Sequence, residues 1–149
     1  MDLILWRHAE AEDGPIDLER RLTWHGRRQA ERTGAWLASN LPGNTRIIVS
    51  PAVRAQETAQ AMRRPFETSA ALAPGATPAD VLGAAQWPDA PHPALVVAHQ
   101  PTLGAVLAAL LSRRDESWVV GTCAAWWLSQ RDRAHQTLRV RAVVDPDLV

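Results

Sequence analysis

The chain contains short apolar runs that end abruptly in polar residues. Residues 3–6 and 94–98 form continuous rather than alternating runs, and residues 46–49 form a third run that begins with an arginine. A short continuous apolar run bounded by turn residues predicts a strand covered on both faces, as in a parallel sheet. Ligands of such sheets bind beyond the carboxyl ends of the strands. The residues that follow each run are therefore candidates for chemistry.

Signals for helices separate these runs. The predicted helices cover residues 23–41, a segment that opens at Ser50-Pro51, a short segment from Thr77 that ends before Pro88, and residues 101–111. Thr23 and Thr77 are suitable N-caps, because a threonine hydroxyl can accept a hydrogen bond from a free N–H of the first turn. Pro51 and Pro78 stand in the first turn of their predicted helices, where the missing N–H costs nothing.

Further extended segments complete the expected sheet. They are residues 66–68, 118–120, 124–128 and 137–144. The last segment alternates between apolar residues and arginines, as a half-buried strand does. The turn 129–136 makes the last two segments a predicted antiparallel hairpin. The pattern predicts an α/β fold: a three-layer α/β/α sandwich around a mostly parallel sheet with an antiparallel edge, in one domain of residues 1–149.

The charge balance narrows the classes of function. The formal net charge is zero, so there is no electrostatic basis for binding nucleic acid or a membrane surface. The sequence contains arginine but no lysine, which excludes Schiff-base chemistry on lysine. An anion must then be held by arginine, histidine or backbone N–H groups. Arginine suits phosphate because its planar fork can bond two oxygens at once.

Cysteine content and apolar stretches bear on the compartment. Cys123 is the only cysteine, so an internal disulfide is impossible, and we expect it to be a small packing residue. The first predicted strand begins almost at Met1, which leaves no room for a secretory signal. No apolar stretch is long enough to span a membrane. We therefore expect a cytoplasmic protein.

Two histidines follow directly after the apolar runs. Arg7 and His8 leave the first predicted strand together, and His99 leaves the strand 94–98. Arg54 stands near the start of a helix, where free N–H groups and the helix dipole already favour an anion. These four residues predict a site for a dianion with a nucleophile beside it. His25, His92 and His135 are expected to lie outside it, and no group has the spacing of a metal site.

Four segments resemble the histidine phosphatase superfamily. They are Arg7-His8, the block from Ser50-Pro51 through Arg54-Ala55 to Thr58, the segment Leu22-Thr23 to Gln29-Ala30, and Ala98-His99. Their order agrees with the family, and they span most of residues 3–107. The short chain and the Arg-His-Ala form resemble the small SixA-type protein-phosphohistidine phosphatases.

The resemblance implies roles for the four candidate residues. His8 would attack phosphorus and carry a transient phosphohistidine, while Arg7, Arg54 and His99 would hold the phosphoryl oxygens. The neighbouring arginines would keep His8 neutral by opposing a second positive charge. No metal or organic cofactor is expected. The implied partner is a phosphohistidine-bearing protein, such as a phosphotransfer domain or carrier.

The chain departs from the family in its general acid. Larger members place a carboxylic acid between the second arginine and the second histidine, but residues 72–75 contain none. Glu10 and Glu12, in the loop after His8, are the possible acids. An alkoxide leaving group needs a proton, whereas an imidazole with a pKa near ~6.5 leaves easily. The missing acid therefore favours a P–N substrate.

Two alternatives remain open on the sequence. The first is a phosphatase for a small phosphomonoester, with Glu10 or Glu12 as the acid. The second is a non-catalytic module that binds a phospho-ligand and keeps the four site residues without useful turnover.

Overall fold

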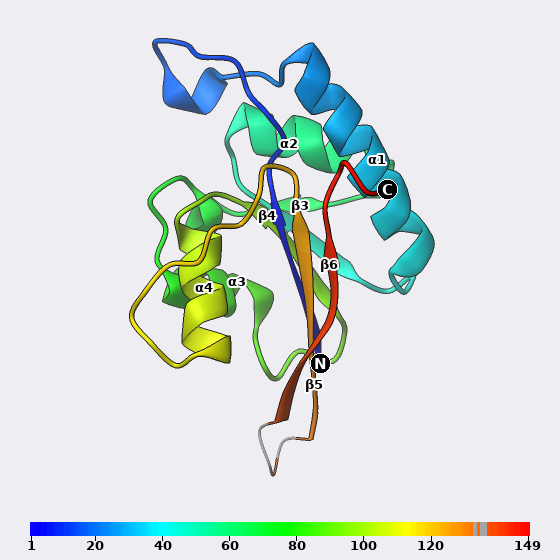
Figure 1. The fold of residues 1–149 in the computed structure, drawn as a ribbon, viewed down its shortest axis with the longest axis vertical. Coiled ribbons are helices and arrows are strands. Elements are labelled where there is room, and N and C mark those ends of the chain that lie inside the picture. The colour runs from blue at the N-terminus through cyan, green and yellow to red at the C-terminus, as the bar shows by residue number, and fades with distance from the viewer. Residues whose placement is uncertain (133, 135–136) are drawn as a thin grey trace.

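The computed structural model describes residues 1–132, 134 and 137–149. The described residues form a six-stranded sheet with the order β3-β2-β4-β1-β5-β6 (Figure 1). The strands are β1 (Asp2–Arg7), β2 (Arg46–Val49), β3 (Glu67–Thr68), β4 (Ala94–Ala98), β5 (Ala125–Asp132) and β6 (Thr137–Val144). The first four strands are parallel, and β5 and β6 are antiparallel. This confirms the mostly parallel sheet with an antiparallel edge.

Helices cover both faces of this sheet. The helices α1 (Trp24–Asn40) and α2 (Val53–Gln60) lie on one face, and α3 (Pro78–Ala85) and α4 (Thr102–Leu111) lie on the other (Figure 1). Ile4 and Trp6 pack in the core beneath α1 and α2, whereas Leu3 and Leu5 pack beneath α3 and α4. Successive strand residues point to opposite faces, so a strand covered on both faces is apolar throughout. The three-layer sandwich is confirmed.

Two helix starts follow the predicted capping chemistry. The Thr23 side chain accepts a hydrogen bond from the N–H of Gly26 at the start of α1. Thr77 and Asp80 form a reciprocal capping box at the start of α3, with Pro78 in its first turn. Among the helices of the described residues, none is long and apolar enough to cross a membrane.

The predicted start of the second helix was two residues early. The helix α2 begins at Val53, and Ser50 and Pro51 lie outside it. The N–H of Ser50 donates to the carbonyl of Val97 at 3.0 Å, which keeps Ser50 in the ladder of the sheet. The chain can enter a helix only after this residue.

The predicted strand at residues 118–120 was wrong. Residues 118–120 lie within the described part of the chain and form no strand there. Their backbone groups serve other partners: the Trp118 carbonyl accepts from Gln100 Nε2 at 2.6 Å, and the Val120 carbonyl accepts from Arg7 Nη1 at 2.8 Å. The segment is therefore fixed by side chains of neighbouring elements instead of by a strand.

The remaining predictions for the sheet edges agree with the structure. The segment 66–68 contributes the two residues of β3. Strands β5 and β6 pair antiparallel as predicted, and β5 extends beyond the expected residues 124–128. Part of the predicted turn 129–136 and the predicted non-catalytic His135 lie outside the described residues.

Two helical glycines provide a matched test of the packing. A Cβ added to Gly26 would collide with the carbonyl oxygen of Glu10, whereas a Cβ on Gly83 would meet nothing. We expect Gly26→Ala to destabilise the protein by about 1–3 kcal/mol, because the loop after His8 must shift. Gly83→Ala should stabilise it by about 0.5–1 kcal/mol, because alanine is the better helix former. Urea unfolding measures both, and equal effects would contradict this account.

Candidate active site

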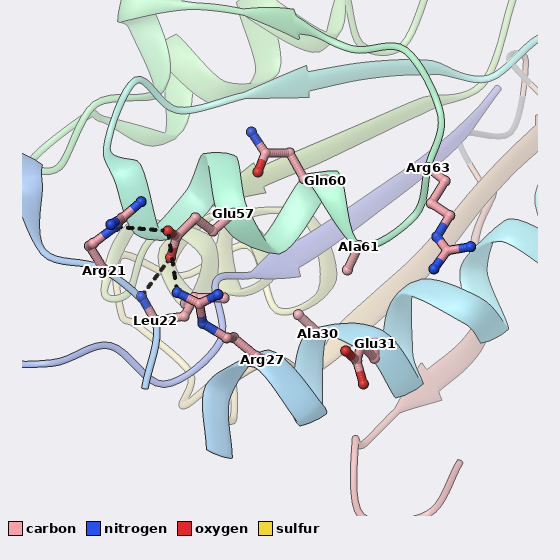
Figure 2. A pocket seen from close by; sticks show the side chains of 9 residues that line it. All are labelled: Arg21, Leu22, Arg27, Ala30, Glu31, Glu57, Gln60, Ala61 and Arg63. Carbon is pink, nitrogen blue, oxygen red and sulfur yellow. Dashed lines mark hydrogen bonds and ion pairs between the residues drawn. The ribbon is translucent and has the colours of Figure 1, made fainter. Parts of the chain in front are cut away.

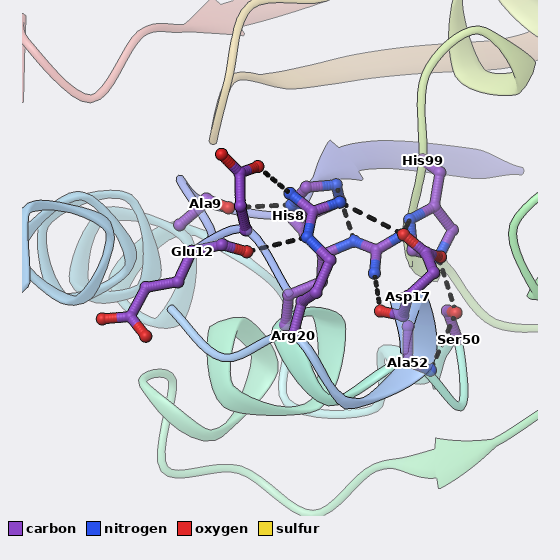
Figure 3. Close-up of polar contacts among 10 residues, drawn as sticks. His8, Ala9, Glu12, Asp17, Arg20, Ser50, Ala52 and His99 are labelled. Atoms are coloured by element: carbon purple, nitrogen blue, oxygen red, sulfur yellow. Dashed lines mark hydrogen bonds and ion pairs between the residues drawn. The ribbon is translucent and has the colours of Figure 1, made fainter. Parts of the chain in front are cut away.

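Three adjacent strands end at the same edge of the sheet. Strand β4 lies between β1 and β2, with Arg7 opposite Ala98 and Val49 opposite Val97. The next residue of each strand is His8, Ser50 or His99. The N–H of His8 donates to the Ala98 carbonyl at 3.1 Å, which continues the ladder beyond the strands. The sheet thus brings these three side chains together, and the rings of His8 and His99 lie 5.1 Å apart between centroids (Figure 3).

The hydrogen bonds of His8 define its tautomer. Its Nδ1 lies 2.7 Å from the carbonyl oxygen of Ala9, which can only accept, so Nδ1 carries the hydrogen. Its Nε2 accepts a hydrogen bond from Nε of Arg54 at 3.3 Å. The lone pair of Nε2 therefore faces the arginine that the sequence predicts to hold a phosphoryl group. This is the orientation that a nucleophile needs.

Both histidines are neutral at physiological pH. The pKa of His8 is lowered to about 4, mainly by burial and also by the charges of Arg54, Arg7 and Arg20. Burial also lowers the pKa of His99 to about 3, with added contributions from His8 and Arg54. The sequence analysis attributed the neutrality of His8 to the arginines, but desolvation is the larger cause.

The two predicted arginines approach the histidines from different elements. Arg54 lies near the start of α2, and its Nη2 is 3.4 Å from Nδ1 of His99. Arg7 ends β1, and its charge lowers the pKa of both histidines. The buried Nε of Arg7 has no hydrogen-bond partner within the described part of the chain. The structure therefore brings the four predicted residues together.

Ser50 belongs to the site, and the sequence analysis did not single it out. Its Oγ lies 2.7 Å from Nε2 of His99 and accepts from the N–H of Ala52 at 3.2 Å (Figure 3). Because Arg54 can only donate to Nδ1 of His99, the Nε2 of that ring carries the hydrogen and donates to Ser50. Ser50 thereby fixes the ring orientation. Its position directly after a strand was a usable signal.

Asp17 is the second residue that the sequence analysis missed. It begins the short 3₁₀ helix η1 (Asp17–Glu19) in the loop after β1. Arg54 donates from Nη1 to the Asp17 carbonyl at 2.8 Å and from Nη2 to Oδ2 at 3.1 Å. Arg20 donates to Oδ1 at 3.1 Å. The hydrogen bonds from Arg20 and Arg54 hold the pKa of Asp17 below its usual value.

The placement of Glu10 and Glu12 does not support either as the general acid. Glu10 accepts a hydrogen bond from the Thr23 hydroxyl at 3.2 Å, so its carboxylate is engaged at the start of α1. Glu12 contacts Arg20 through its backbone carbonyl, and its carboxylate points away from His8 (Figure 3). The bridge between Ala11 and Leu22 closes the base of this loop.

A cavity of about 460 Å³ lies beside the same loop, between α1 and α2 (Figure 2). Its lining includes Arg21, Arg27, Arg63 and Glu57, and neither His8 nor His99. The carboxylate of Glu57, on α2, accepts from Arg21 Nε at 3.1 Å and from the N–H of Leu22 at 2.8 Å. This contact ties the loop that carries Asp17 to the helix that carries Arg54.

The other candidate groups lie elsewhere. His25 is 3.9 Å from a Glu10 oxygen, and His92 pairs with Asn44 at 3.0 Å. Cys123 is buried, and burial raises the pKa of its thiol to about 11, as expected for a packing residue. Among the described residues, no cluster of three or more His, Cys, Asp or Glu side chains is placed to hold a metal ion.

The comparisons with known proteins agree on one family. The model of the histidine phosphatase superfamily (branch 1) matches residues 3–76. The phosphohistidine phosphatase SixA homolog of Haemophilus influenzae is 33% identical in an alignment that covers 77% of this chain and 80% of that protein. A solved structure from Nakamurella multipartitia that carries the SixA name is 26% identical, with a TM-score of 0.77 over 97% of this chain and 95% of that one. The protein histidine phosphatase SixA complexed with tungstate shares the fold, with a TM-score of 0.79 at 21% identity over 99% of both chains.

The lowered histidine pKa values predict sensitivity to acid. Between pH 7.5 and pH 5 the unfolded chain protonates its histidines near pH 6.5, while His8 and His99 stay neutral down to about 4 and 3. The unfolded state then binds more protons, so the free energy of unfolding falls as the pH falls. We expect a loss of roughly 1–2 kcal/mol for each histidine at pH 5. Urea unfolding at the two pH values, followed by tryptophan fluorescence, measures it.

Two variants separate this effect from general acid denaturation. His99→Gln should make the loss in the free energy of unfolding between pH 7.5 and pH 5 smaller by the contribution of one histidine, because glutamine does not titrate. His92→Gln is the control for the loss of a histidine elsewhere in the chain, because His92 is exposed. A wild-type pH dependence in His99→Gln would contradict the assignment.

Proposed function

Because the chain belongs to the histidine phosphatase superfamily, whose members are phosphatases, we propose that it hydrolyses protein phosphohistidine through a covalent intermediate on His8. The observation that carries the proposal is the Nε2 lone pair of His8, neutral and directed at the guanidinium of Arg54 at 3.3 Å. A nucleophile beside a fixed cation is what attack on a phosphoryl dianion requires.

In the first half-reaction, the Nε2 lone pair of His8 forms a bond to phosphorus while the bond to the leaving group breaks. The Nδ1–H stays on the carbonyl of Ala9, so the ring becomes a phosphohistidine without losing that hydrogen. Arg54 and Arg7 would bind the phosphoryl oxygens as charge shifts during transfer.

In the second half-reaction, water attacks phosphorus and His8 departs with its electron pair restored on Nε2. The products are inorganic phosphate and the neutral imidazole with which the cycle began. His99, held by Ser50, lies 3.4 Å from Arg54 and within ring contact of His8, and it would bind the same oxygens by turning its Nε2–H from Ser50 to the phosphoryl group. No metal or organic cofactor takes part in this proposal.

The chemistry of the leaving group supports a P–N substrate. The carboxylate that touches the site is Asp17, and its pKa is held low by Arg20 and Arg54, so it has no proton to give at neutral pH. The departing oxygen of an alkyl phosphomonoester needs such a proton, whereas the departing nitrogen of an imidazole can leave without being protonated. The phosphohistidine phosphatase named among the relatives is consistent with this preference. The partner would be a protein that presents phosphohistidine on its surface.

The proposal is tested with two substrates. Wild-type protein should release phosphate from a phosphohistidine-bearing phosphotransfer protein faster than from an alkyl phosphate. His8→Asn should lose at least about 10³-fold in kcat on any substrate, because the nucleophile is gone. The wild-type enzyme, quenched during turnover, should carry an acid-labile phosphoryl group that His8→Asn lacks.

The matched control replaces an exposed histidine of the same chain. His92→Asn should keep wild-type rates, since His92 contacts Asn44 and lies outside the site. Fast hydrolysis of small alkyl phosphates with slow hydrolysis of phosphohistidine would favour the small-phosphomonoester alternative. Binding of phosphate without turnover of any substrate would favour a binding module.

A further inference from the structure

The carboxylate of Asp17 occupies a place that the mechanism above does not explain. Arg54 directs Nη2 both at Asp17 Oδ2, 3.1 Å away, and at His99 Nδ1, 3.4 Å away. The same guanidinium directs Nε at the nucleophilic Nε2 of His8. One planar group therefore joins the carboxylate, the nucleophile and the second histidine. A carboxylate in this position lies beside any phosphoryl group that Arg54 binds.

Asp17 lies on the outer side of that guanidinium. Its side chain is 54% exposed, whereas the side chain of Arg54 is only 5% exposed. In phosphoryl transfer the attacking and leaving atoms lie roughly in line with phosphorus. His8 attacks from the interior, so the leaving group departs toward the solvent, which is the side that Asp17 faces.

Arg20 holds the carboxylate in this place independently of Arg54. It donates from Nη1 to Asp17 Oδ1 at 3.1 Å and from Nε to the Glu12 carbonyl at 2.7 Å. When a phosphoryl group takes over Nη2 of Arg54, the bond to Arg20 remains. The position of the Asp17 side chain is therefore set by the loop and does not change when a phosphoryl group binds.

We propose that ionised Asp17 accepts a hydrogen bond from the distal ring N–H of the substrate phosphohistidine and so holds that ring in the protonated form, which departs as neutral imidazole. The inference rests on the proposed function and names the group of this chain that recognises the P–N substrate. A carboxylate hydrogen-bonded to a charged donor is among the stronger contacts available to a protein.

The step balances without an acid. The phosphorylated ring of the substrate is protonated at its distal nitrogen, and that N–H⁺ donates to Asp17. As the Nε2 of His8 bonds to phosphorus, the P–N electron pair of the substrate returns to the ring, which leaves as neutral imidazole with its distal N–H in place. Without the distal proton the ring would leave as imidazolate, a much poorer leaving group.

The same carboxylate disfavours phosphoesters of ordinary alcohols. An alkoxide needs a proton at the departing oxygen, and the low pKa of Asp17 leaves it none to donate. An aryl phosphate with an electron-poor ring needs no proton, so it reports on the nucleophile and the phosphoryl site alone. This contrast isolates the role of Asp17.

The experiment compares Asp17→Asn with Glu19→Gln in the full-length chain. Glu19 lies in the same 3₁₀ helix, so its replacement makes the same change of charge in the same loop. The measured quantity is kcat/KM, which reports the steps through phosphorylation of His8. The substrates are a phosphohistidine-bearing phosphotransfer protein, free phosphoimidazole and p-nitrophenyl phosphate.

We expect Asp17→Asn to lose about 10–100-fold in kcat/KM on the two P–N substrates, the effect of one charge-assisted hydrogen bond. On p-nitrophenyl phosphate it should stay within about threefold of wild type, and inorganic phosphate should inhibit it at the same or lower concentration, because a negative charge beside Arg54 is gone. Glu19→Gln should match wild type on all three substrates.

Other outcomes overturn the inference in distinguishable ways. Equal losses on P–N and aryl substrates would mean that Asp17 only positions Arg54, and unchanged rates on all substrates would mean that it has no role. A wild-type protein that hydrolyses the aryl phosphate but neither P–N compound would overturn the proposed function itself, whatever the variant does.

Discussion

The parallel pairing of β1 and β2 with β4 is the constraint on which the site depends. Parallel strands held in register end at one edge, so the residue after each strand arrives at the same place whatever its distance in sequence. His8, Ser50 and His99 come together in this way across more than ninety residues of chain. The N–H groups of His8 and Ser50 prolong the ladder by one bond each, which fixes the backbone beneath the reacting side chains. Rigid backbone at this point favours a preorganised site.

Burial and charge act together at this edge. Two partly or fully buried imidazoles stay neutral because desolvation disfavours their protonated forms, and the guanidiniums of Arg54 and Arg7 add to that effect. The arginines in turn need an anion, because a buried positive charge without a partner is costly. In the free protein Asp17 supplies that anion to Arg54, while the Nε of Arg7 is left without a partner among the described residues. Under the proposed function, this arrangement would attract a phosphoryl group and keep His8 neutral for attack.

The charged loop after β1 supplies the outer part of the site. The bridge between Ala11 and Leu22 closes its base, Glu57 ties it to α2, and Arg20 bonds it internally at Glu12 and Asp17. The contacts of Arg20 are polar and exposed and the contact of Glu57 is partly buried, unlike the apolar core that holds the sheet. Under the proposed function, this loop would face the leaving group, and changes in it would leave the sheet edge that carries His8 in place.

The sequence by itself determined the strands, most of the helices and the four residues Arg7, His8, Arg54 and His99. Continuous apolar runs and capping residues are local signals, and a residue that follows a buried strand has its place set by the sheet. Only the tertiary structure decided the roles of Asp17 and Ser50 and the fate of residues 118–120. Their positions depend on hydrogen bonds between side chains and partners 18 to 113 residues away, such as Arg7 with Val120. Glu10 and Glu12 are close to His8 in sequence, yet Glu10 bonds to Thr23 and the Glu12 carboxylate points away from His8 (Figure 3), because side-chain direction in a loop follows from its long-range contacts.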